Sequence, residues 1–150
     1  MTTYFDSSVL VKAYCLETTS PQALTLIRRA EPPLLFTPLH AIEIKNALRL
    51  KRHRKELTQF QLRGALENLQ HDIHSGFLHM PDLDVRAVFD HAEFLSAAHT
   101  AVIGARSLDI LHVAAASLLG ARQFVSFDRR QRSLAFKAGL KILPRIMPKS

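Results

Sequence analysis

The stretch TYFDSSVLV, residues 3–11, decides the fold of this chain. Three residues that suit a short strand run directly into Asp6, and two serines then open a helical pattern. A strand that passes into a helix through one polar residue is the start of a βαβ unit, from which parallel sheets are built. In such sheets ligands bind beyond the carboxyl ends of the strands, so Asp6 lies where chemistry is expected.

Short apolar runs alternate with helical patterns along the rest of the chain. Glycine and proline residues bound these runs, which predict strands at 3–5, 34–37, 77–80, 124–127 and 141–143. The patterns between them predict helices at 8–15, 21–29, 39–54, 58–75, 84–101, 107–119 and 129–138. The alternation predicts an α/β fold: a single domain over residues 1–150, with a central parallel sheet of four to five strands flanked by helices on both faces.

The charge of the chain is the feature of its composition that bears most on function. The 150 residues include 20 Lys and Arg against 13 Asp and Glu, a net charge of +7, which favours phosphate-rich or acidic partners. The longest uncharged runs have 12 residues, too few for the roughly 20 apolar residues of a membrane span. The lone Cys15 and a start without a basic leader predict a cytoplasmic protein with no membrane partner.

Four acidic residues occupy positions at which a solvent-exposed acidic side chain is not expected. Asp6 and Asp128 each follow a predicted strand and precede a helix, where an N-cap is the alternative interpretation. Asp109 opens a helix that is apolar on nearly every side, and Ser107 offers a cap two residues earlier. Glu43 lies inside the helix 39–54 between two isoleucines, where an ion pair one turn away is the alternative.

These four carboxylates predict a metal site if they converge, because like charges cannot all stay ionised close together without a cation. Oxygen ligands without Cys or His favour Mg²⁺ or Mn²⁺ over zinc. The hypothesis is that Asp6, Asp109 and Asp128 hold one or two ions. Glu43 completes the set of ligands, either directly or through a water molecule. An acidic cluster in a basic protein thus indicates metal-assisted hydrolysis of phosphodiesters.

Four segments carry a resemblance to a known family: YFDSSVLVK at 4–12, EIKNAL at 43–48, LDILHVAA at 108–115 and FVSFDRRQ at 124–131. At these residues the chain resembles the PIN-domain ribonucleases, and most closely the VapC toxins of toxin–antitoxin pairs. The segments stand in the family's order and span nearly the whole chain. The part between residues 57 and 105 diverges from the pattern.

The resemblance implies a fold, an activity and partners. It implies a PIN domain acting as a Mg²⁺- or Mn²⁺-dependent endoribonuclease on RNA, inhibition by a small VapB-type antitoxin, and a homodimer. The residues that fall on the family's acidic quartet are Asp6, Glu43, Asp109 and Asp128. Ser7 and Ser126 match small polar residues that stand beside the quartet. From its position one turn after Asp109, His112 either supports the site or packs in the core.

Basic residues gather at two places. In the helix that carries Glu43 they include Lys45, Arg49, Lys51 and Arg52, which we interpret as an RNA-backbone track; a solvated helix end is the alternative. Arg129, Arg130 and Arg132 follow Asp128 and are placed to clamp substrate phosphates. Two other functions stay open: a PIN nuclease in RNA processing outside a toxin pair, and a non-catalytic basic nucleic-acid-binding module whose acids are caps and ion-pair partners.

Overall fold

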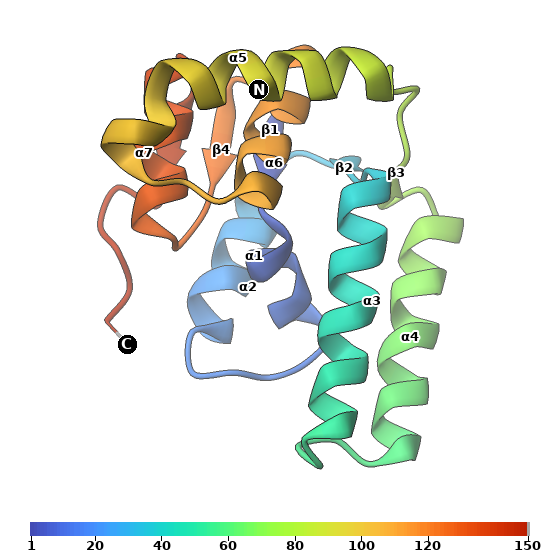
Figure 1. Cartoon of the computed structure of the whole chain (residues 1–150). Helices are drawn as coiled ribbons and strands as arrows, with labels where there is room; N and C mark the ends of the chain where they lie inside the picture. Colours follow the sequence, from blue (N-terminus) through green and yellow to red (C-terminus); the bar gives the residue numbers. More distant parts are fainter. Residues whose placement is uncertain (150) are drawn as a thin grey trace. The chain divides into compact units, whose positions relative to one another are not determined.

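The fold is taken from a computed structural model, which describes residues 1–149 (Figure 1). The contacts within the chain divide it into two compact units. The first unit joins Met1–Asp6 to Asp82–Met147, and the second consists mainly of Ser7–Pro81. The chain therefore passes from one unit to the other directly after Asp6. The expectation that residues 1–150 form a single domain stays a prediction.

The first unit contains a parallel sheet of three strands. These are β1 (Thr3–Phe5), β4 (Gln123–Val125) and β5 (Lys141–Leu143), in the order β1-β4-β5. Tyr4 is aligned with Phe124, and their rings stack with centroids 5.5 Å apart. Both residues are fully buried. A one-residue slip of β1 would turn these rings to the opposite face, so burial fixes the register.

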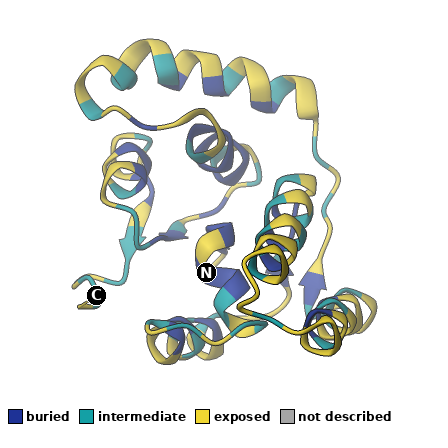
Figure 2. Ribbon diagram, turned by 60° about the horizontal axis from the view of Figure 1, so that its bottom comes forward, coloured by how far each residue is buried: buried dark blue, intermediate teal, exposed yellow. Residues whose placement is uncertain are grey.

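Three helices complete the first unit: α5 (Val85–Ile103), α6 (Ser107–Leu118) and α7 (Arg129–Lys137). The helix α6 packs against both of the others. Every residue from Ile110 to Ala116 is buried, and most of this helix is dark blue in Figure 2. This burial on all sides is the reason for its uniformly apolar sequence. The helix α5 ends at Gly104, whose left-handed φ of 73° suits glycine.

The second unit is mostly helical. Its elements are α1 (Ser7–Leu10), a 3₁₀ turn η1 (Val11–Ala13), α2 (Ser20–Arg29), β2 (Leu34–Leu35), α3 (Pro38–His53), α4 (Gln59–His74) and β3 (Leu78–His79). The helices α3 and α4 run side by side as a hairpin (Figure 1). A capping box starts α4: Gln61 N–H donates to Thr58 Oγ1, and Thr58 N–H donates to Gln61 Oε1.

The helices match the sequence prediction closely, and the α/β class and the parallel pairing are confirmed. The exception is the helix predicted over residues 8–15, in which α1 ends at Leu10 and the 3₁₀ turn follows. Within residues 1–149 no helix combines the length and the apolar character needed to cross a membrane.

The sheet is smaller than the sequence predicts, and this part of the prediction is wrong. We expected four to five strands in one sheet, but among residues 1–149 the strands β2 and β3 form a parallel pair of their own. Prolines stand near both strands: Pro32 and Pro33 precede β2, Pro38 begins α3, and Pro81 comes two residues after β3. Each strand has two residues, and the N–H of Phe36 still donates to the carbonyl of His79 directly after β2.

Candidate active site

Asp6 lies at the carboxyl end of β1. Its backbone N–H donates to the carbonyl of Val125 at 2.9 Å, which continues the pairing with β4 one residue past the strand. The residue is only 5% exposed. A carboxylate buried to this degree is costly unless it has partners that stabilise its charge. Asp6 therefore lies where the sequence predicts it, directly after a strand, and it is withdrawn from solvent.

Asp128 follows β4 and caps α7. Its Oδ1 accepts the N–H of Gln131 at 2.8 Å, and its own N–H donates to the hydroxyl of Ser126 at 3.0 Å. The N-cap interpretation of this residue is thus correct, and such a cap stabilises a helix by about 1 kcal/mol. The cap leaves Asp128 half-buried at the same end of the sheet as Asp6.

Asp109 stands in the first turn of α6 and is half-buried. Its Oδ2 pairs with Nε of Arg106 at 3.3 Å. Burial raises the pKa of the Asp109 carboxyl, the charge of Asp6 raises it further, Arg106 lowers it, and Asp128 raises it again. The net shift is upward. The carboxylates of Asp6 and Asp128 therefore both repel the ionised carboxylate of Asp109 within the first unit.

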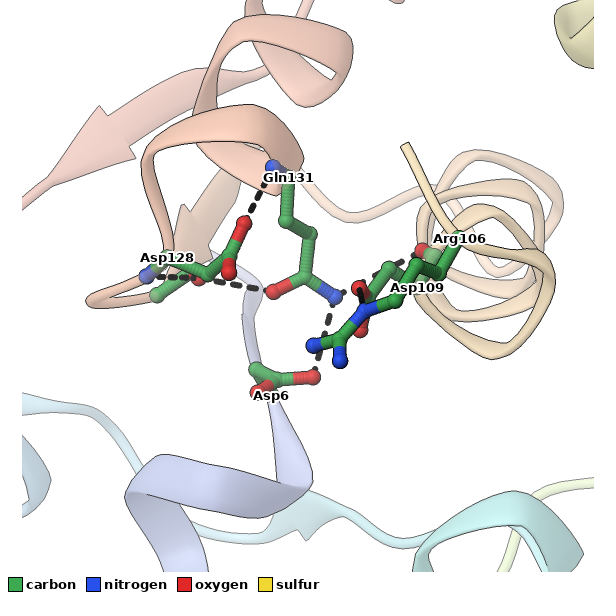
Figure 3. A network of polar contacts seen from close by, with 6 residues as sticks. Asp6, Arg106, Asp109, Asp128 and Gln131 are labelled. Atoms are coloured by element: carbon green, nitrogen blue, oxygen red, sulfur yellow. Dashed lines mark hydrogen bonds and ion pairs between the residues drawn. The ribbon is translucent and has the colours of Figure 1, made fainter. Parts of the chain in front are cut away.

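Gln131 is the residue at the centre of this group that the sequence prediction missed (Figure 3). Its side chain is fully buried, and its Nε2 donates to Asp6 Oδ1 at 2.9 Å. Ser126, also fully buried, donates its hydroxyl to Gln131 Oε1 at 2.7 Å. One signal in the sequence could have found it: Gln131 stands three residues after an aspartate N-cap, in the spacing of a capping box.

Glu43 and Ser7 both belong to the second unit. Glu43 is half-buried in α3, and the hydroxyl of Ser7 donates to its Oε1 at 3.1 Å. Ser7 is the next residue along the chain from Asp6. The hydroxyl of Ser7 is therefore bonded to one of the four predicted acidic residues, Glu43.

His112 takes the second of the two roles that the sequence left open. It is fully buried in α6, and its Nδ1 forms a 2.7 Å hydrogen bond with the hydroxyl of Tyr4 in β1. The rings of the two residues meet edge to face. This buried pair joins the strand that ends at Asp6 to the helix that begins near Asp109.

The arginines after Asp128 divide into two kinds. Arg129 and Arg130 are exposed and line a cavity of about 430 Å³ together with Arg106, Phe127 and Asp128. Arg132 instead turns inward: its guanidinium donates to the carbonyls of Ser126, Leu143 and Pro144. The suggestion that Arg132 clamps substrate is therefore wrong, because its donors already hold the chain around β5.

The basic residues of α3 also differ from one another. Lys51 pairs with Glu17 at 3.1 Å and with Glu56 at 3.5 Å, so its charge is already balanced. Arg49 and Arg52 are exposed, and Lys45 is half-buried. An RNA track along this helix stays a prediction for Lys45, Arg49, Lys51 and Arg52, with Lys51 the least available of the four.

The three carboxylates of the first unit suit a divalent cation in their chemistry. All the donors are oxygen, and a cation would relieve the repulsion that raises the pKa of Asp109. Within residues 1–149, however, no three His, Cys, Asp or Glu side chains are already arranged to hold one ion. Asp128 uses its Oδ1 for the helix cap, and Asp109 uses its Oδ2 for Arg106.

Comparison with known proteins gives a likeness in fold. No protein-family model matches the chain, and no curated protein matches its sequence. Among solved structures, FitAcB from Neisseria gonorrhoeae superposes with a TM-score of 0.66. The match covers 95% of this chain and 96% of that chain at 14% sequence identity. At this identity the likeness shows a shared fold over nearly the full length of both chains.

Proposed function

We propose that this chain is a Mg²⁺- or Mn²⁺-dependent endoribonuclease of the PIN-domain type that acts as the toxin of a VapBC-type pair. One observation carries the proposal. Asp6, Asp109 and Asp128 lie far apart in the sequence, and burial together with the charges of Asp6 and Asp128 raises the pKa of Asp109 in spite of Arg106. Structural carboxylates are ordinarily paired with bases, so a repelling group at the end of a sheet is typical of a functional site.

The proposed roles follow from the position of each side chain. Asp6, Asp109 and Asp128 would hold the ion, and Glu43 joins them in the proposal because its partner Ser7 follows Asp6 directly. A bound divalent ion supplies an activated water and neutralises charge that develops on the phosphate. The residues of the chain contribute orientation: β1 and β4 place Asp6 beside the end of β4, and the first turn of α6 presents Asp109.

The cavity beside Asp128 supports a phosphate-bearing substrate. Arg129 and Arg130 lie at the N-terminus of α7, where backbone N–H groups and the helix dipole also favour anions. Arg106 lines the same cavity while it pairs with Asp109. A nucleic-acid strand in this cavity would meet three arginines and the carboxylate of Asp128. Phosphates of RNA are the ligands we assign to Arg129 and Arg130.

The partners follow from the same proposal. A VapB-type antitoxin would bind the toxin and block its site, and the toxin would form a homodimer in the cytoplasm. The resemblance at residues 4–12, 43–48, 108–115 and 124–131 is what supports these partners. Co-purification of the full chain with a small protein encoded beside it would separate a toxin from a PIN nuclease that processes RNA without an antitoxin.

A second function is favoured by a specific observation. Asp128 caps α7, and Asp109 pairs with Arg106, which are the roles acids play in a non-catalytic protein. A basic module that binds nucleic acid without cutting it would use Arg129 and Arg130 in the same way. Metal binding distinguishes the two functions, because only the nuclease needs the carboxylates to close around an ion.

The test of the proposed nuclease is to map cleavage ends. Purified full-length protein is incubated with total cellular RNA and Mn²⁺ or Mg²⁺, and the new ends are ligated and sequenced. We expect 5′-phosphate and 3′-hydroxyl ends, because water and not the ribose 2′-hydroxyl attacks the phosphorus. EDTA should stop the reaction.

Two variants control this test. Asp6→Asn should cut no RNA, since an amide is a poor ligand for Mg²⁺. Asp90→Asn should cut like the unaltered protein, because Asp90 is an exposed partner of Arg86 on α5. Ends carrying 2′,3′-cyclic phosphate, or cleavage that persists in EDTA, would contradict the proposal. Binding of RNA without cleavage and without bound Mn²⁺ would favour the non-catalytic module.

A further inference from the structure

We propose that Gln131 is a positioning residue of the candidate active site: its amide holds the carboxylate of Asp6 in one orientation, in which Asp6 would serve as a ligand of a divalent cation. This inference rests on the metal site of the proposed function. Nothing in the resemblance assigns a role to this glutamine. It is carried by a set of buried hydrogen bonds that all belong to the first unit (Figure 3).

The side chain of Gln131 has a defined partner at each end. Its Nε2 donates to Asp6 Oδ1 at 2.9 Å and makes a longer contact of 3.5 Å with the carbonyl of Asp109. Its Oε1 accepts the hydroxyl of Ser126 at 2.7 Å. One amide thus reaches β1, the turn after β4 and the first turn of α6. These are the three places that carry the carboxylates.

The orientation of the amide is dictated by its neighbours. Ser126 Oγ accepts the N–H of Asp128, so the hydroxyl hydrogen remains to donate to Gln131 Oε1. A carboxylate can only accept, so the nitrogen end must face Asp6. The reverse orientation would set two acceptors against each other at Asp6. The amide therefore holds Oδ1 of Asp6 in one place, and this sets the direction of the other oxygen.

A second glutamine in the molecule shows that this geometry is not what helix capping alone produces. Gln61 occupies the same third position of α4, and its Oε1 accepts the N–H of the N-cap residue Thr58. In α7 the hydroxyl of Ser126 takes over that task by accepting the N–H of Asp128. Gln131 consequently turns away from the cap, and its side chain is fully buried against Asp6.

The amide of Gln131 is uncharged, and this matters for cation binding. A lysine or arginine at this point would also donate to Asp6, but its positive charge would repel a cation from the carboxylates. An amide gives Asp6 a hydrogen bond and leaves the negative charge of the site intact. Groups that orient metal ligands in this way typically change metal affinity by about 10- to 100-fold when they are removed.

The experiment compares two glutamine-to-methionine variants in the full chain. Methionine keeps the length of the side chain and removes the amide, while the backbone N–H that completes each cap stays in place. The dissociation constant of Mn²⁺ is measured by calorimetry, and thermal unfolding is measured in EDTA. We expect Gln131→Met to weaken Mn²⁺ binding about 10-fold or more. We expect Gln61→Met to lower stability but to bind Mn²⁺ like the unaltered protein.

Ser126→Ala provides a second variant should Gln131→Met fail to fold. It keeps the amide but removes the hydroxyl that orients it, so Mn²⁺ binding should again weaken. In a folded double variant, Ser126→Ala should add little to the loss caused by Gln131→Met, because both act through one amide.

The outcomes separate this inference from the proposed function. Mn²⁺ affinity that is unchanged in Gln131→Met overturns the inference, whether or not RNA is cut. The same holds for Ser126→Ala if only that variant folds, and for an unaltered protein that binds no Mn²⁺. If the unaltered protein binds Mn²⁺, the variants weaken it and no RNA is cut, then the proposed function fails and the role of Gln131 stands.

Discussion

Two groups of charged side chains, one in each unit, differ in how their acidic residues are surrounded. The ion-pair group of the second unit consists of Lys12, Glu17, Lys51 and Glu56. Glu17 lies 3.2 Å from Lys12 and 3.1 Å from Lys51, and Lys51 also reaches Glu56. The carboxylate group of the first unit consists of Asp6, Asp109 and Asp128. Its partners include Arg106, which pairs with Asp109, and the neutral amide of Gln131, which donates to Asp6.

The pKa shifts record the difference between the two groups. Burial raises the pKa of Glu17, but the hydrogen bonds and charges of Lys51 and Lys12 lower it below its usual value. For Asp109 burial and the neighbouring carboxylates outweigh Arg106, and the pKa rises. The ionised form of Glu17 is thus stabilised by its neighbours, whereas that of Asp109 is not. The group that contains Asp109 is the one we assign to catalysis.

The largest expected difference between the two groups is in activity. Asp109→Asn should lower the rate of RNA cleavage at least about 100-fold, because it removes a carboxylate that we assign to holding the ion, and the ion would neutralise charge on the reacting phosphate. Glu17→Gln, the same change of acid to amide, should leave the rate nearly unchanged. Initial rates at saturating Mn²⁺ measure both variants. If both variants lost the same fraction of the cleavage rate, the assignment of catalysis to the carboxylate group would be wrong.

The next difference is in the sign of the effect on stability. The pKa of Asp109 is raised on folding, so its ionisation destabilises the protein above the folded pKa, and this cost disappears below the ordinary value of 3.8. Asp109→Asn should therefore raise the melting temperature at pH 7 by about 1–2 °C, a small shift because solvent screens this half-buried carboxyl.

Glu17 should behave in the opposite way. Its folded pKa is lowered, so its ionisation stabilises the protein above the ordinary value of 4.5, and this gain is lost as the pH falls through the folded pKa. Glu17→Gln should lower stability at pH 7 by about 0.5–1 kcal/mol, since its ion pairs are partly exposed. Thermal unfolding between pH 4 and pH 8 measures both variants. Shifts of the same sign at pH 7 would contradict the assignment.

The smallest expected effect concerns RNA binding by arginines of the two units. In an Asp6→Asn background, Arg129→Gln and Arg49→Gln should each flatten the dependence of log affinity on log salt concentration by about one unit of slope. Arg86→Gln should leave the slope unchanged, because Arg86 lies on α5 with Asp90 as its partner. If only Arg129→Gln changes the slope, then the run on α3 is a solvated helix end.

Much of the site was predictable from the sequence because its parts are local. A strand followed by an acid and a helix can be read from a few neighbouring residues, which is how Asp6 and Asp128 were found. The burial of α6 follows from its apolar sequence, and this made Asp109 conspicuous. The hydrogen bond between Ser7 and Glu43 joins two predicted site residues, although no spacing in the chain predicts that they meet.

The errors concern residues whose partners lie far along the chain. Arg132 has the same local surroundings as Arg129 and Arg130, yet its guanidinium holds the carbonyls near β5. Gln131 has the spacing of a capping residue, but it reaches an aspartate 125 residues away. The extent of the sheet was misjudged for a related reason, since strands of two residues carry too little pattern to show which strands they pair with.

The sequence by itself determined the alternation of strands and helices and the positions of the carboxylates, because backbone geometry and side-chain periodicity act over a few residues. Only the tertiary structure decided which side chains serve those carboxylates. Each such choice is a difference of about 1 kcal/mol between competing hydrogen bonds. Folding decides between these hydrogen bonds by burying particular groups together. It places Gln131 against Asp6, whereas Gln61 stays bonded to its helix cap.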